Sequence, residues 1–294
     1  MESSETSSGQ HVLMKDQSKI KKAIRHTTIV VNSRDRNFRN YPNPNHFRYT
    51  LRRPLTNVTC IELMNGSVPA FIYNIQPAWG SFNFFESPNL MNKITLTPGF
   101  YTECQILVEL QYKLNAMPGK SNTYTVTQNP VTRKITIGSN SIVSFCILFY
   151  SGDTKDEIDL NTFAIMSINT PARLLGFGNN DYNSSNGSIR AVLPMDLNNF
   201  LSRLYLHIET DGKSLDRMEQ SAGRRDCFHI FYINPGTTDY LLLNKETDHS
   251  AYTSSPAPIA RVSNLEISIR DEFNRFVDLN HREVNLVFEI THLE

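Results

Sequence analysis

The sequence has few of the features that mark an enzyme, a membrane protein or a secreted protein. Its four cysteines, Cys60, Cys104, Cys146 and Cys227, stand far apart and form no C-x-x-C pair, which argues against a zinc ribbon or a thioredoxin-like motif. We expect four buried, reduced thiols. No apolar run approaches the roughly 20 residues that a membrane-spanning helix needs, and the polar N-terminus lacks the apolar core of a secretory signal.

Catalytic and metal-binding motifs are also missing. The chain has no H-E-x-x-H and no G-x-S-x-G, and its two Gly-Lys-Ser segments, at Gly119 and Gly212, lack the second glycine of a P-loop and indicate turns. An enzyme would need His207, His229 and an acidic residue to converge in a pocket. The solvated start of a helix explains the clustering of four acidic residues better than a calcium-binding loop does. These residues are Asp153, Asp156, Glu157 and Asp159. We therefore predict no catalysis, no metal and no cofactor.

Charge is distributed unevenly, although the chain as a whole is formally neutral. Residues 1–53 hold eleven lysines and arginines but only four acidic residues, so the rest of the chain is acidic by the same margin. This pattern indicates a basic N-terminal arm on a mildly acidic body. We place the arm at residues 1–25 and the body at residues 26–294.

The arm is the segment whose charge most directly suggests binding. Lys15, Lys19, Lys22 and His26 fall at helical spacing, which predicts a short basic helix over residues 15–25 that forms on docking. Such an arm suits phosphates, anionic lipids or an acidic protein groove. Because no aromatic residues interleave with the lysines, we favour a protein or lipid surface over nucleic acid. Its candidate partner-binding residues are Lys15, Lys19, Lys21, Lys22 and Arg25.

The body has the pattern of a β protein. Short runs of branched and aromatic residues are bounded by Gly, Pro or Asn, and alternate with period two most clearly at Phe47, Tyr49 and Leu51. The predicted strands are 27–31, 47–51, 58–64, 71–75, 81–86, 93–97, 124–128, 134–137, 143–150, 188–193, 203–209, 228–233, 240–243, 264–270 and 284–291. This favours a mainly β fold, an antiparallel jelly-roll sandwich of two sheets, with two small sandwiches as the alternative.

One helix is indicated among these strands. Thr102 and Gln105 form a capping box, and Pro118-Gly119 ends the segment. Its apolar face comprises Ile106, Leu107, Leu110 and Leu114. A second stretch over 159–166 has a weaker helical pattern, and residues 172–175 predict a single turn that Gly176 stops. We expect a small helical insertion in the sandwich at about residues 100–180.

Several short motifs occur in order along the chain. V-N-S-R-D-R at 31–36, Y-P-N-P-N-H-F at 41–47 and V-T-C-I-E-L at 58–63 come first. T-P-G-F-Y-T at 97–102, L-L-G-F at 174–177 and N-L-V-F-E-I at 285–290 follow. In these motifs the chain resembles the minor capsid and penton-type proteins of nucleocytoplasmic large DNA viruses, over nearly everything from Thr27 to the C-terminus.

The resemblance implies a jelly-roll component of an icosahedral shell that is not an enzyme. Its implied partners are the major capsid protein and other minor capsid proteins, with a pentamer of this chain if it is a penton and contact of the arm with an inner membrane. The implied location is the virion, after assembly in the host cytoplasm. The alternative is an exposed glycan- or receptor-binding module, for which Trp79 and Tyr182 in polar loops are the aromatic candidates.

The first two motifs also have a physical meaning of their own. Pro42 and Pro44 fix φ and push the residues before them toward extended conformations, which makes a rigid corner between two strands. The arginines of the S-R-D-R motif flank Asp35, and a bidentate pair with its carboxylate would brace that corner. We favour such a local brace over an interface contact. The remaining candidate partner-binding residues are Arg34, Arg36 and Trp79.

Overall fold

The computed structural model describes residues 23–86, 90–158, 165–178, 180–198, 202–218, 226–234, 239–245 and 252–294. Strands dominate this part of the chain, and the strands pair in antiparallel fashion. The predicted mainly β, antiparallel fold is therefore confirmed, and its sheets are consistent with a sandwich. The jelly-roll strand order stays a prediction. No helix within these residues is long and apolar enough to cross a membrane.

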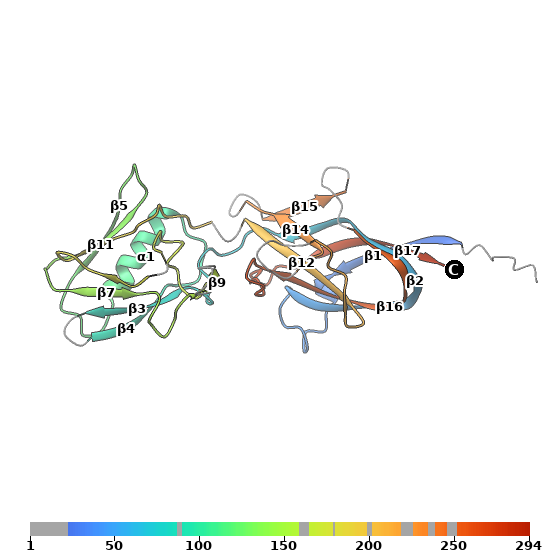
Figure 1. Ribbon diagram of the computed structural model, residues 1–294, viewed down its shortest axis with the longest axis horizontal. Coiled ribbons are helices and arrows are strands. Elements are labelled where there is room, and N and C mark those ends of the chain that lie inside the picture. Colours follow the sequence, from blue (N-terminus) through green and yellow to red (C-terminus); the bar gives the residue numbers. More distant parts are fainter. Residues whose placement is uncertain are drawn as a thin grey trace, which may run out of the picture.

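Figure 1 shows two lobes side by side along the long axis of the molecule. One lobe contains an eight-stranded sheet in the order β1-β17-β2-β16-β12-β13, with β14 paired to β12 and β15 paired to β2. We call this the large sheet. Its strands are β1 (Ile24–Asn32), β2 (His46–Pro69), β12 (Arg203–Thr210), β13 (Lys213–Ser214), β14 (His229–Tyr232), β15 (Tyr240–Asn244), β16 (Tyr252–Arg270) and β17 (Asn285–Leu293).

Strand β2 is continuous where the sequence predicted two strands, at 47–51 and 58–64. Asn57 has a φ of 53°, a left-handed conformation that asparagine tolerates better than most residues. Beside it, the pairing of β2 with β16 shifts register twice. Such bulges change which face a side chain points to, so Phe47 and Leu51 before the bend and Val58 and Ile61 after it are all buried. The sequence pattern did not predict this bulge, and for that reason the single strand β2 was predicted as two strands.

The large sheet curls so that its parts pack on one another. The ring of Phe288 in β17 meets the ring of Phe228, next to β14, edge to face at 6.3 Å between centroids. Alternate residues of β17 are buried in the core: Leu286, Phe288, Ile290 and His292. Alternating burial of this kind is typical of a strand with one face in the core.

Residues 70–202 lie between β2 and β12, and we call their described part the small-sheet lobe. Its sheets have the orders β10-β7-β3-β4, β11-β6-β5 and β8-β9. The strands are β3 (Ser81–Glu86), β4 (Leu90–Thr95), β5 (Tyr124–Gln128), β6 (Ile135–Ser139), β7 (Phe145–Leu148), β8 (Glu157–Ile158), β9 (Ile165–Ser167), β10 (Tyr182–Asn183) and β11 (Ser188–Arg190).

The helix of this lobe, α1 (Glu103–Asn115), has the predicted capping box between Thr102 and Gln105. Three of its predicted apolar residues, Ile106, Leu110 and Leu114, are fully buried, whereas Leu107 is only partly buried against the core. The helix ends at Asn115, before the predicted Pro118-Gly119 stop.

Other predictions need correction. Residues 71–75 are not a strand but a coil with one isolated bridge, from Ile75 to Gly99. The helical stretch expected at 159–166 is partly outside the described residues, and its described end belongs to strand β9. Ile24 and Arg25, assigned to the arm, belong to β1. Residues 172–175 do form one turn, and Gly176 follows it with a φ of 80°.

The cysteine prediction is confirmed only in part. All four thiols are reduced, but Cys227 alone is buried, since Cys104 is exposed and Cys60 and Cys146 are intermediate.

Candidate functional site

The S-R-D-R and Y-P-N-P-N motifs meet at the side chain of Arg36, which is only 4% exposed. Its Nη1 donates to the carbonyl oxygen of Ser33 and to Oε2 of Glu283, both at 2.7 Å. Its Nε donates to the carbonyl oxygen of Tyr41 at 3.0 Å, and Nη2 to that of Pro42 at 3.2 Å. We call these residues the arginine brace. The predicted brace exists, but the carboxylate comes from Glu283 and not from Asp35.

The electrostatics of the arginine brace favour an ionised Glu283. Partial burial on its own would raise the pKa of this carboxyl, but hydrogen bonds from Ser33 and Arg36 and the charge of Arg36 hold it below its usual value. Ser33 Oγ also accepts a hydrogen bond from the backbone N–H of Val284. The motif at residues 33–36 is thereby tied to the segment that enters β17. Because 247 residues separate Arg36 from Glu283, no local sequence pattern pointed to this partner.

Trp79 lies inside the molecule, at the joint between the two lobes. It is 4% exposed, its Nε1 donates to the carbonyl oxygen of Asn74 at 3.0 Å, and the guanidinium of Arg275 lies 4.8 Å from its ring centre. Arg275 also pairs with Asp271 at 2.8 Å and donates to the carbonyl oxygen of Ile168. The loop after β16 thus holds the small-sheet lobe through Trp79.

These contacts correct two of the predicted partner-binding residues. Arg36 and Trp79 are buried within this chain and are not surface contacts. Tyr182, the second aromatic candidate for glycan binding, accepts a hydrogen bond from the N–H of Gly178 at 2.7 Å and packs on Phe149 and Phe177. Both aromatic residues of the glycan-binding alternative are therefore engaged in internal packing.

The other predicted contacts divide into two groups. Arg25 and Arg34 are exposed, and Arg25 pairs with the equally exposed Glu294 at 2.5 Å. The four lysines of the arm, Lys15, Lys19, Lys21 and Lys22, lie outside the described residues. The helix predicted over residues 15–25 is wrong at its end, because Ile24 and Arg25 belong to strand β1.

His207 and His229 do not converge. His207 is buried in β12, where its Nδ1 lies 2.8 Å from Oδ2 of Asp216, which is also buried. His229 is paired in register with Leu206. Directly opposed residues share a face of the sheet and neighbours along a strand alternate, so His207 and His229 lie on opposite faces. The arrangement required by the enzyme hypothesis is absent from this pair.

The acidic residues at 153–159 also differ from expectation. Asp156 does not start a helix: it is buried, and its Oδ1 accepts from the N–H groups of Asn169 and Thr170 and from the Thr170 hydroxyl. Burial raises the pKa of Asp156, and these hydrogen bonds offset only part of that shift. Asp159 lies outside the described residues. Within the described part of the chain, no three His, Cys, Asp or Glu side chains gather in a way that could hold a metal ion.

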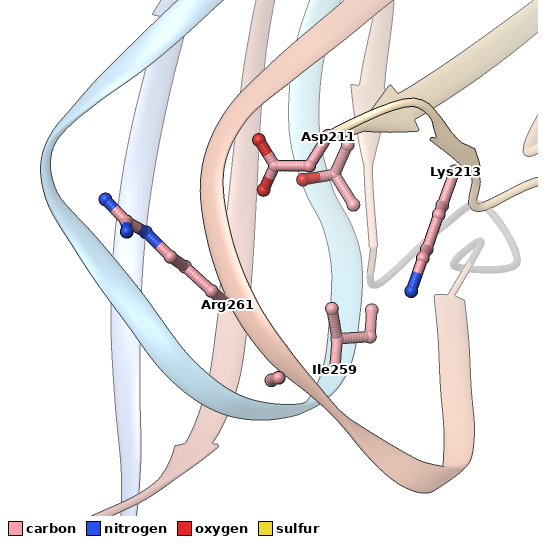
Figure 2. Close-up of a pocket in the computed structure, with 6 residues that line it drawn as sticks. Asp211, Lys213, Ile259 and Arg261 are labelled. Carbon is pink, nitrogen blue, oxygen red and sulfur yellow. The ribbon is translucent and has the colours of Figure 1, made fainter.

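A surface pocket of about 310 Å³ lies where the turn between β12 and β13 approaches the bend of β16. The acidic residue of its lining, Asp211, already has partners, because its carboxylate accepts hydrogen bonds from Ser263 Oγ and Asn264 Nδ2, each at 2.7 Å. Figure 2 shows Lys213, on β13, and Arg261, on β16, extending in different directions. Their charges therefore do not meet in the pocket, and Asp211 braces the bend.

Comparison with known proteins gives little further information. A family of unknown function (DUF5901) matches residues 16–152, which is less than half of the chain. No curated protein matches the sequence. Among solved structures, the mavirus penton protein is similar over 93% of this chain and 100% of its own, with 11% sequence identity and a TM-score of 0.37. A similarity of this degree supports no conclusion about function.

Proposed function

We propose that this protein is a structural component of an icosahedral virus shell, of the minor capsid or penton type. On this proposal it acts by occupying a position among other shell proteins, namely the major capsid protein and further minor capsid proteins. The sequence motifs described above motivate the choice of family. The arginine brace is the structural observation that best supports the role.

The brace supports a structural role because the motif residues in it hold the backbone in one shape. Arg36 bonds to three backbone carbonyl groups and one carboxylate, so the first two motifs fix the shape of a corner at the start of the large sheet. Residues that keep a shape constant are what a repeated building block needs, because its contacts depend on an invariant surface.

The basic arm is the second part of the proposal. We assign it the task of tethering the folded body to a neighbouring shell protein or to an inner membrane. Even a weakly binding tether increases the overall affinity of a docked body for its neighbour, since the second contact forms at a high effective concentration.

A particle-assembly assay with the major capsid protein would test both parts. Because β1 begins at Ile24, the arm should be removed at residues 1–22, which leaves the large sheet intact. We expect the truncated protein to fold by circular dichroism and to enter particles less efficiently than the full chain. A full-length variant in which Lys15, Lys19, Lys21 and Lys22 are replaced by glutamine separates the charge of the arm from its length.

The outcomes are distinct. If the truncated and full-length chains enter particles equally, the tethering role is wrong. If neither chain enters any particle, the proposed shell role itself is contradicted.

A further inference from the structure

Strand β1 lies at an edge of the large sheet, and its outer side is open within the described part of the chain. It pairs with β17 along its whole length, from Ile24 opposite Leu293 to Asn32 opposite Asn285, without a bulge. The sheet order ends at β1. Ile24 and Val30 are 67% and 59% exposed. A nine-residue edge is therefore available to another strand.

The pairing with β17 shows which backbone groups of β1 are free. Ala23 and Glu294 exchange two hydrogen bonds, and the N–H of Ser33 donates to Val284. In an antiparallel pair, bonded residues recur at every second position, so the odd-numbered residues from 23 to 33 face β17. The N–H and C=O groups of Ile24, His26, Thr28 and Val30 consequently point away from the sheet.

Three other edges in the described part of the chain, those of β5, β13 and β4, carry protection that β1 lacks. The edge of β5 is capped by α1, because Asn115 and Gln111 side chains accept from the N–H groups of Tyr124 and Val126. Strand β13 has two residues and β4 contains a lysine. Short edges, inserted charges and covering elements are the usual means of preventing strand addition. The ionisable side chains of β1 have partners within this chain: Arg25 pairs with Glu294, the residue after β17, and His26 Nδ1 lies 3.4 Å from Oε1 of Glu289 in β17.

We propose that β1 is a strand-addition surface for a second copy of this chain, with the two β1 strands antiparallel across a two-fold axis at Thr28. Full overlap places Thr28 opposite Thr28 of the second copy, His26 opposite its Val30 and Ile24 opposite its Asn32. Each of these pairs joins residues whose N–H and C=O groups are free. The two Arg25 side chains lie at opposite ends of the pairing, so no like charges meet. The inference concerns pairs of this chain and does not rest on the proposed shell role.

The register makes a cysteine test possible. Bonded residues on antiparallel strands have Cα atoms about 5.5 Å apart, which suits a disulfide. In a chain carrying Cys104→Ser to remove the exposed thiol, Thr28→Cys should form a disulfide-linked dimer under mild oxidation. Ile24→Cys is the matched control, because two copies of residue 24 would lie about 26 Å apart at 3.3 Å per residue. Equal cross-linking of the two variants, or none with Thr28→Cys, would overturn the proposal.

A second measurement uses no cysteine. Sedimentation of the full chain should show a monomer that becomes a dimer as concentration rises, since one strand pair buries less area than a standard interface. Thr28→Pro removes an N–H that β17 does not use, so the fold should persist while the dimer is lost. Thr28→Ser keeps the N–H and should keep the dimer. A chain that stays monomeric at millimolar concentration, or a folded Thr28→Pro variant that dimerises normally, would contradict the inference.

Discussion

The two lobes differ in the contacts that stabilise each of them internally. The large sheet relies on long strands from distant parts of the chain, such as the 24-residue β2 and the 19-residue β16. The small-sheet lobe has strands of two to six residues and compensates with a helix and with aromatic packing, in which the rings of Phe84, Tyr124 and Phe145 lie 5.1 to 5.4 Å apart. Both lobes bury apolar side chains, but the first adds long-range backbone pairing and polar braces, whereas the second adds a helix and aromatic packing between short strands.

A large expected change in the free energy of unfolding comes from removing the arginine brace of the large sheet. Arg36→Ala removes the partner of Glu283 and the donor to three carbonyl groups. Because the Glu283 side chain is 25% exposed, we expect a loss of about 3 kcal/mol, the lower end of the cost of breaking a buried pair. Urea unfolding measures the change. Arg34→Ala is the control, since this exposed neighbour should alter stability by less than about 0.5 kcal/mol. Equal, small effects of the two variants would show that the brace does not stabilise the corner.

The next effect tests side-chain packing in the small-sheet lobe. Leu110 is fully buried, so Leu110→Ala should lower the free energy of unfolding by about 2 to 5 kcal/mol. Val108 on the same helix is 70% exposed, and Val108→Ala should leave stability nearly unchanged. Thermal unfolding of the two variants measures the difference. An unchanged melting temperature for Leu110→Ala would mean that the helix is not held by this face.

The smallest effect concerns pH and has opposite signs in the two lobes. The pKa of Glu283 is lowered in the folded state, so its contribution to stability is present above its unfolded pKa and is lost as pH falls through the folded value. The pKa of Asp156 is raised, so the folded state gains stability as pH falls through that raised value. Glu283→Gln should therefore weaken the acid-induced loss of stability, and Asp156→Asn should strengthen it. Unfolding free energies measured from pH 7 to pH 3 would detect both changes, and identical changes in the two variants would contradict the assignment.

Local patterns predicted much of the fold. The bounds of β3 and β5 agree with the expected ranges, and the capping box of α1 is present as expected. These features depend on neighbouring residues alone. The segment 71–75 has the composition of a strand but forms the joint between the lobes, where Phe71 packs on Phe100 and lies under Arg282. Composition does not distinguish a buried coil from a strand, because both bury apolar side chains.

The candidate site was harder to predict because its residues meet partners from distant parts of the sequence. The sequence indicated that Arg36 braces a corner, but its carboxylate partner follows from the pairing of β1 with β17, which brings the residues around 33 and 284 together. Likewise Trp79 looked like a residue of a polar loop, but the guanidinium of Arg275, nearly two hundred positions later, lies over its ring. Contacts between distant segments carry no local signature.

The position of β17 also has a consequence for how the protein is made. Strand β17 follows every other described element in the sequence, yet it lies between β1 and β2 in the large sheet, so that sheet cannot close until residues 285–293 have been synthesised. The small-sheet lobe is built from an internal stretch and can form earlier, since domains emerging from the ribosome tend to fold in order of synthesis. Until β17 arrives, β1 and β2 expose unpaired edges, and premature termination before Asn285 would leave a product prone to aggregation.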